Sequence, residues 1–120
     1  ELKRFMVRLL ANTTDTATGP TIGGDYRISN RAITVKAVGA YVDTAGTTGV
    51  CTFDINEAGT TILSTKITID STEKSSETAA TPPVISDAAI AADAVVTFDI
   101  DAINTTPAKG LVVWVDYCYA

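Results

Sequence analysis

Three aspartates are the side chains of this 120-residue chain whose pattern most suggests chemistry. They occur in two nearly identical phrases, TFDIN at 52–56 and TFDID at 97–101, and are Asp54, Asp99 and Asp101. Apolar and polar residues alternate in both phrases, which places the aspartates on the solvated face of a strand. If the two strands are neighbours, the carboxylates converge and could bind calcium through their oxygens. The same groups could act as the acid and the base of a glycosidase.

Other features of the sequence argue against both uses of the aspartates. The chain has no calcium loop of the DxDxDG type, and a small sandwich lacks the apolar cleft that a glycosidase acid needs. It contains no histidine, which excludes Ser–His and Cys–His nucleophiles. We therefore predict a non-enzymatic protein with no cofactor and no metal ion. In this interpretation the two phrases are strands that each bury one face.

Aromatic residues near the C-terminus form a second candidate site. Alternation predicts that one set of side chains faces the core, namely Leu111, Val113, Val115 and Tyr117. The other set then faces outward: Val112, Trp114, Asp116 and Cys118. An outward Trp114 could stack on a sugar, with Tyr117 and Tyr119 completing the platform, or could lie at the centre of a subunit interface. The interpretation that we favour packs Trp114 into the core or against the N-terminal strand.

The two cysteines do not suggest a covalent or metal-binding role. The alternation points Cys51 inward and Cys118 outward, which argues against a disulfide between them. No histidine or third thiol is present to complete a zinc site. A buried free thiol is the expectation for Cys51.

Charge and hydropathy exclude two classes of partner. The net charge is −5, and the basic residues cluster only at Lys3, Arg4 and Arg8, so we expect no nucleic-acid partner. The apolar run Leu111–Val115 is far too short to cross a membrane, so we expect no membrane insertion. Arg8 interrupts the apolar stretch of the first ten residues, which is unlike a signal peptide.

The pattern of elements predicts an all-β protein, an antiparallel β-sandwich with a jelly-roll-like order. Strands are expected at 3–10, 33–43, 51–56, 60–69, 95–103 and 110–119. A β-bulge is expected beside Gly39, where the apolar phase slips, and a short helical turn is expected within 86–93. We expect one globular domain, with an N-terminal strand or arm and a loop at 1–24 and the sandwich at 25–120.

Three segments resemble a small β-sandwich module of tailed-bacteriophage virion proteins. They are VGAYVDTAGTTG at 38–49, DINEAGTTILSTKITID at 54–70 and DAVVTFDIDAINTTPAKGLVVWV at 93–115, and the resemblance covers about residues 33–119. It implies a structural or adhesive role as head decoration, head fibre or tail fibre, displayed on the virion surface. It also implies assembly into homo-oligomers and gives no catalytic residues.

Three hypotheses of function follow. The first is a virion structural protein that assembles through its sheet faces or edges, as a trimer and with other virion proteins, using Phe5, Val7, Leu9 and Trp114. The second is a carbohydrate-binding module that attaches to a host-surface glycan or polysaccharide through Trp114, Tyr117 and Tyr119. The third is a subunit of an extracellular filament in which neighbours exchange a donor strand.

Overall fold

The computed structural model describes residues 1–120 and consists of strands, one 3₁₀ turn and the loops between them. The strands are β1 (Lys3–Asp15), β2 (Ile33–Tyr41), β3 (Cys51–Glu57), β4 (Thr60–Thr61), β5 (Leu63–Thr65), β6 (Ile67–Ile69), β7 (Val84–Ile85), β8 (Ala89–Ile90), β9 (Val96–Ala102) and β10 (Lys109–Tyr119). All their pairings are antiparallel. The predicted all-β class is confirmed, and the jelly-roll-like order stays a prediction.

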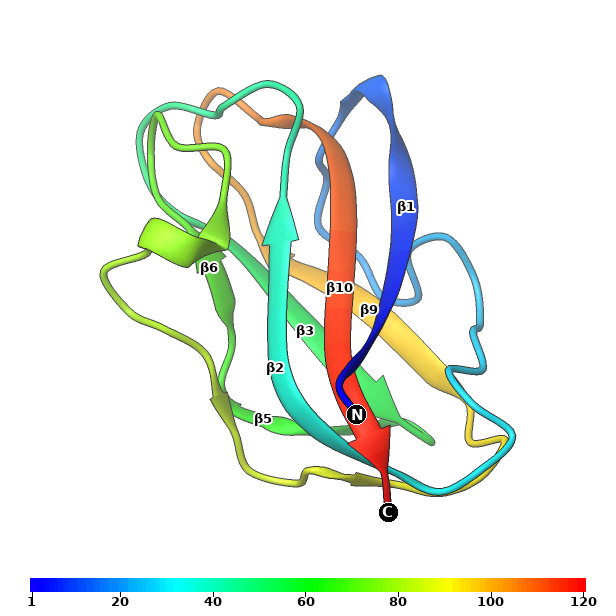
Figure 1. The fold of residues 1–120 in the computed structure, drawn as a ribbon. Helices are drawn as coiled ribbons and strands as arrows, with labels where there is room; N and C mark the ends of the chain where they lie inside the picture. Colours follow the sequence, from blue (N-terminus) through cyan, green and yellow to red (C-terminus); the bar gives the residue numbers. More distant parts are fainter.

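Two main sheets face each other in a sandwich-like arrangement. The first sheet has the order β1-β10-β2-β8. In the second sheet β3 is central, with β9 on one side and β4 and β6 on the other, while β5 and β7 form a small separate ladder. Figure 1 shows β3 and β9 running obliquely behind β2 and β10. The repeated phrases TFDIN and TFDID therefore lie in neighbouring strands, β3 and β9, which is the arrangement that brings their aspartates together.

The core lies between the inner faces of the two sheets. It is made mostly of β-branched and aromatic side chains, which pack well on a pleated surface. The largest of its fully buried side chains include Phe53, Ile55, Ile67, Phe98 and Ile100 from the second sheet and Ile33, Leu111 and Val113 from the first. The inward phase predicted for β10 is confirmed, because Leu111, Val113, Val115 and Tyr117 all belong to this cluster.

The bulge in β2 lies at Lys36 and Ala37 and not beside Gly39. In the register with β10, Asp116 pairs with Ala37 and Tyr117 pairs with Val35, so Lys36 is the extra residue. Lys36 and Ala37 are both exposed, and the inward phase resumes after them. The sequence could not locate the slip, because a small residue such as Ala37 fits either face.

Gly39 has a packing role of its own, because it leaves room for Trp114. The two residues are paired across β2 and β10, and the indole ring lies over the glycine. A Cβ atom at residue 39 would lie 2.1 Å from Cζ2 of Trp114 and 2.5 Å from Cε2. No side chain fits at this position while the ring stays where it is.

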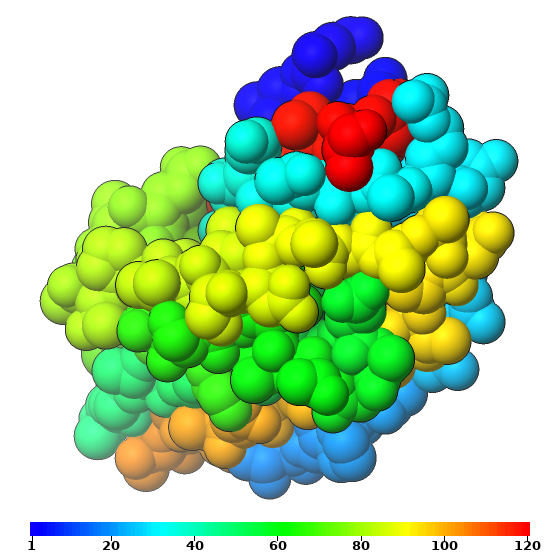
Figure 2. All heavy atoms as spheres, turned by 90° about the horizontal axis from the view of Figure 1, so that it is seen from below, coloured from blue at the N-terminus to red at the C-terminus, as the bar shows by residue number.

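The short helical turn expected within 86–93 is wrong. This part of the chain is extended, because Ala89 and Ile90 pair with Thr34 and Ile33 of β2. Tertiary pairing here overrides the helical preference of alanine. Figure 2 shows the stretch around residues 80–95, in yellow, lying between the cyan β2 region and the green residues near 60 at this end of the molecule. The one helical turn is instead 3₁₀, at Ser76–Thr78, and begins after Ser75, whose side chain accepts a hydrogen bond from the backbone N–H of Glu77.

Residues 1–24 are joined to both sheets. β1 pairs with β10 as far as Asp15, beyond the predicted end at residue 10. The segment that follows runs along the outer edge of β9, with bridges from Gly19 to Ile100 and from Tyr26 to Val96. The stretch predicted as an arm and a loop thus completes one sheet and covers an edge of the other.

Replacing Gly39 with alanine tests the packing of Trp114. The added methyl group must displace the indole ring, so Gly39→Ala should lower the free energy of unfolding by about 2–3 kcal/mol in urea denaturation. Gly19→Ala is the control, because its Cβ would meet nothing closer than 3.7 Å and should change the free energy by less than about 0.5 kcal/mol. Equal stability of the two variants would contradict the packing account.

Candidate functional site

The edge of the first sheet formed by β1 is the most prominent candidate site. This 13-residue strand pairs with β10 on one side, in a ladder that is regular from Lys3 to Arg8 and irregular beyond, and with no strand on the other side. No backbone hydrogen bond outside the strand ladders involves the first 15 residues. β1 therefore presents a row of N–H and C=O groups with no backbone partner, which is a template for another strand.

The hydrogen bonds of β2 show which backbone groups of β1 are free, because the directions of the backbone groups in β2, β10 and β1 are linked through their pairing. The N–H of Ala40 donates to Oγ of Ser76 at 3.0 Å, and the N–H of Val42 donates to O of Lys74 at 2.8 Å. Both bonds lead away from β10. Because backbone groups alternate between the two edges of a strand, Gly39 then faces β10.

The same alternation determines the directions of the backbone groups in β10 and then in β1. Gly39 is paired with Trp114, so the backbone groups of Trp114 point toward β2. Met6 lies opposite Trp114 on the other side and receives no bond from it. The N–H and C=O groups of Met6, and of Arg4 and Arg8 in the same phase, therefore point outward. The N–H and C=O groups of Phe5, and of the residues in the same phase as Phe5, bond to β10.

The side chains of β1 leave apolar surface next to this free edge. Phe5, Val7 and Leu9 face the second sheet as one row, and only Leu9, at 8% exposed, is fully covered. Phe5 is half-buried, with its ring edge-on to Tyr26 at 6.1 Å between centroids. On the outer face Met6 is 48% exposed. A strand added at this edge would cover apolar side chains on both faces of the sheet.

Trp114 faces outward, as predicted, but is only 7% exposed. It lies on Gly39, opposite Met6, with the ring of Tyr41 at 6.5 Å between centroids. The guanidinium carbon of Arg4 lies 5.2 Å from the centroid of the indole, in a cation–π contact. The chain's own residues thus cover the ring, in agreement with the interpretation that packs Trp114 against the N-terminal strand.

Arg4 also forms a two-pronged ion pair with Asp116. Its Nε and Nη2 donate to the two carboxylate oxygens at 2.6 and 2.9 Å. This hydrogen-bonded guanidinium lowers the pKa of Asp116 below its usual value of 3.8 and outweighs the opposite effect of burial. Arg8 binds Asp43 in the same way, with Nη1 at 2.7 Å from Oδ2. The two arginines therefore fasten β1 to the rest of the sheet.

The three aromatic residues predicted as a sugar platform do not share a surface. Tyr117 belongs to the inward phase of β10 and is 9% exposed, whereas Trp114 lies on the outer face. Tyr119 is more exposed, but its ring is already occupied by cations. The guanidinium of Arg31 lies 3.9 Å from its centroid and Nζ of Lys3 lies 5.3 Å away.

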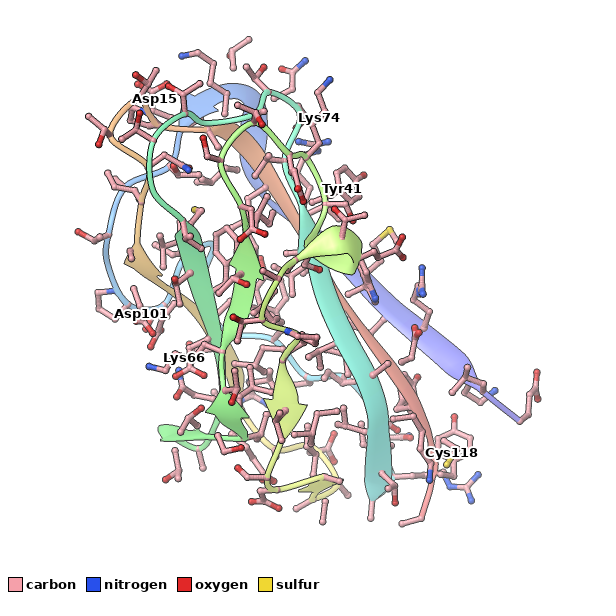
Figure 3. The ribbon with its side chains drawn as sticks, turned by 90° about the vertical axis from the view of Figure 1, so that its left-hand side faces the viewer. Asp15, Tyr41, Lys66, Lys74, Asp101 and Cys118 are labelled. Atoms are coloured by element: carbon pink, nitrogen blue, oxygen red, sulfur yellow. The ribbon has the colours of Figure 1, made fainter.

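The three predicted calcium candidates lie close together on the outer face of the second sheet. Asp54 is directly opposite Asp99 in the pairing of β3 with β9. Nζ of Lys66 lies 2.7 Å from Asp101 and 3.4 Å from Asp54, which raises the pKa of Lys66, chiefly through its hydrogen bond to Asp101. Figure 3 shows Lys66 and Asp101 side by side. No pattern in the sequence pointed to this lysine, which lies between β5 and β6.

Protein donors already bind these carboxylates. Asp54 is buried and accepts hydrogen bonds from the N–H of Ile55 and the hydroxyl of Thr61. Asp99 accepts from the N–H of Thr21 at 3.0 Å and from Nδ2 of Asn56 at 2.9 Å. No three acidic, histidine or cysteine side chains of the chain are placed to hold a metal ion. The aspartates form an ion-paired, hydrogen-bonded patch.

Both cysteines are free, as the alternation indicated. Cys51 is buried in the core, and burial raises the pKa of its thiol to about 11. The thiol of Cys51 is therefore protonated at neutral pH and is a poor nucleophile. Cys118, labelled in Figure 3, is half-buried near the end of β10.

The sequence did not indicate a groove that lies between β2 and β7. Its volume is about 420 Å³, and its lining residues are Lys36, Ala37, Val38, Pro83, Val84 and Ile85. The bulge in β2 and the short strand β7 create it. Neither element could be located from the alternation of apolar residues.

Comparison of the chain with protein-family models, with curated proteins and with solved structures found no match. The resemblance to the phage virion module therefore rests on the three quoted segments alone. The structure contains no helix of the length and hydropathy needed to cross a membrane.

The Arg4–Asp116 pair predicts a specific response to acid. Because the pKa of Asp116 is lower in the folded chain, its contribution to stability is fully present above about pH 4 and is lost as the pH falls below that value. Urea denaturation between about pH 7 and pH 2 should give a flatter stability profile for Asp116→Asn than for the wild type. Asp25→Asn, at an exposed residue without an ion pair, should keep the wild-type slope. Parallel profiles for Asp116→Asn and the wild type would contradict the assignment.

Proposed function

We propose that this chain is a non-enzymatic structural protein that assembles with copies of itself through the open edge of β1. The observation that carries the proposal is a long strand edge that has no neighbour and is flanked by exposed or half-buried apolar side chains. β1 contains no proline, and its register shifts lie after Arg8 and after Leu10, so residues 3–8 keep a regular edge of the kind that can pair with another strand.

The composition of β1 allows two copies to pair by this edge. An antiparallel pairing that is symmetric about Phe5 places Arg4 opposite Met6 of the second copy and Lys3 opposite Val7. No like charges then face each other directly. Arg4 is also neutralised within its own chain by Asp116. In this register residues 3–7 of the two strands pair, which provides about 17 Å of edge, at about 3.3 Å for each residue.

The resemblance to phage virion proteins supplies the biological setting of the proposal. It supports a decoration or fibre component on the virion surface, with other virion proteins as further neighbours. Symmetric edge pairing closes with two chains, so by itself it does not build the expected trimer. A separate heterologous contact with threefold symmetry would give a trimer, and both contacts together would give a hexamer.

The geometry favours neither of the other two hypotheses. A sugar platform needs coplanar exposed rings, and Trp114 and Tyr117 lie on opposite faces of β10. A donor-strand filament needs a sheet that lacks a strand until a neighbour supplies it, and β1 pairs with β10 of its own chain.

A proline at residue 6 tests the proposal, because its ring blocks the free edge without removing a bond to β10. The mass of the wild type by light scattering should be that of a closed oligomer, and Met6→Pro should be a monomer that still unfolds cooperatively. Met6→Ala is the matched control: it shortens the same side chain but keeps the N–H group, and it should still assemble. A Met6→Pro protein with the wild-type mass, or a monomeric wild type, would contradict the proposal.

A further inference from the structure

The opposite edge of the first sheet has a gap in its covering. β8 pairs with β2 only at Ile33 and Thr34, and the N–H of Val35 donates to O of Ala88 at 2.8 Å. Further along β2, the next group with a partner on this side is the N–H of Ala40, bonded to Ser76. Residues 36–39 between these points have no hydrogen-bonded strand on this side.

The backbone of Val38 points into this gap. Val38 lies two residues before Ala40 and beyond the bulge, so its N–H and C=O groups share the direction of those of Ala40, away from β10. No hydrogen bond outside the strand ladders reaches either group of Val38. A donor and an acceptor of one residue therefore face the groove side by side, as they would to receive one residue of an added strand.

The groove provides an apolar wall beside these backbone groups. Of its six lining residues, Val84 is half exposed, at 50%, and Ile85 packs against the core. The wall lies opposite Val38 across a space of about 420 Å³. One apolar side chain projecting from an added strand would be covered there on both sides.

The only charged residue that lines the groove is Lys36. It is exposed and takes part in none of the ion pairs of the chain, whereas Arg4, Arg8, Lys66 and Lys109 each have an acidic partner. In a chain of net charge −5, a free lysine beside an open strand edge favours a carboxylate in the ligand.

We propose that this groove is a binding site for an extended, acidic peptide segment of another protein. The segment adds a short antiparallel strand to β2, with an apolar residue opposite Val38 and an acidic residue directly after it, beside Lys36. The open stretch of four residues spans about 13 Å, so the bound segment is about four residues long. This site is separate from the β1 edge, which lies on the other side of β10 and β2.

Two capped pentapeptides test the proposal, TTVDT and its counterpart TTVKT. Each is titrated into the labelled full chain to about 5 mM, and the amide resonances are followed by NMR. TTVDT should shift the amides of Lys36, Ala37 and Val38 and slow the hydrogen exchange of Val38. TTVKT should bind about threefold to tenfold more weakly, as expected for the loss of one exposed ion pair and its replacement by repulsion.

Matched charge reversals show whether the groove itself is responsible. Lys36→Glu should reverse the preference, so that TTVKT binds more tightly than TTVDT. Lys74→Glu changes the net charge equally at an exposed lysine outside the groove, and it should leave the order unchanged.

Two results would overturn the proposal. One is the absence of any shift at residues 36–38 with both peptides. The other is a shift of the same amides on raising the protein concentration alone, because the occupant of the groove would then be a second copy of this chain. Both results leave the Met6→Pro test of the β1 edge unaffected.

Discussion

The stack of Trp114 between Gly39 and Arg4 determines how the first sheet is held together. Within the first sheet, β10 is the only strand bonded on both sides along most of its length, and Trp114 lies at its centre. The ring lies flat because residue 39 has no side chain, and Arg4 covers it from β1 while binding Asp116. One arginine thus joins an aromatic contact to an ion pair, and both favour the pairing of β1 with its own chain.

The edges of the two sheets differ in how their backbone groups are covered. At β9 the backbone is covered by the segment from Gly19 to Tyr26, which donates and accepts hydrogen bonds along the strand. At β1 no strand pairs with the free edge, and at β2 the hydrogen-bonded covering is interrupted over residues 36–39. A protein that protects one edge and leaves others open has the surface needed for assembly by strand addition. The ion-paired aspartates of the second sheet lie on its outer face.

Alternation of apolar residues was sufficient to predict the long strands, the inward and outward phases of β10, and the free state of both cysteines. It failed where a residue fits either face, as Ala37 does at the bulge, and where pairing overrides propensity, as at Ala89 and Ile90. The covering of Trp114 depends on Arg4, which is 110 positions away in the sequence, and no local pattern carries that information. The partners of Asp54, Asp99 and Asp101 were missed for the same reason, because Lys66 reaches them only through the folded arrangement of β3, β6 and β9.

Amide hydrogen exchange at two protein concentrations tests most directly whether the β1 edge is the assembly surface. The amides of Arg4, Met6 and Arg8 point away from β10, so in dilute solution they should exchange much faster than those of Phe5 and Val7, which bond to it. At high concentration the first three should become protected while Phe5 and Val7 change little. Equal exchange of Met6 at both concentrations, in a sample whose mass shows an oligomer, would place the interface elsewhere and contradict the account.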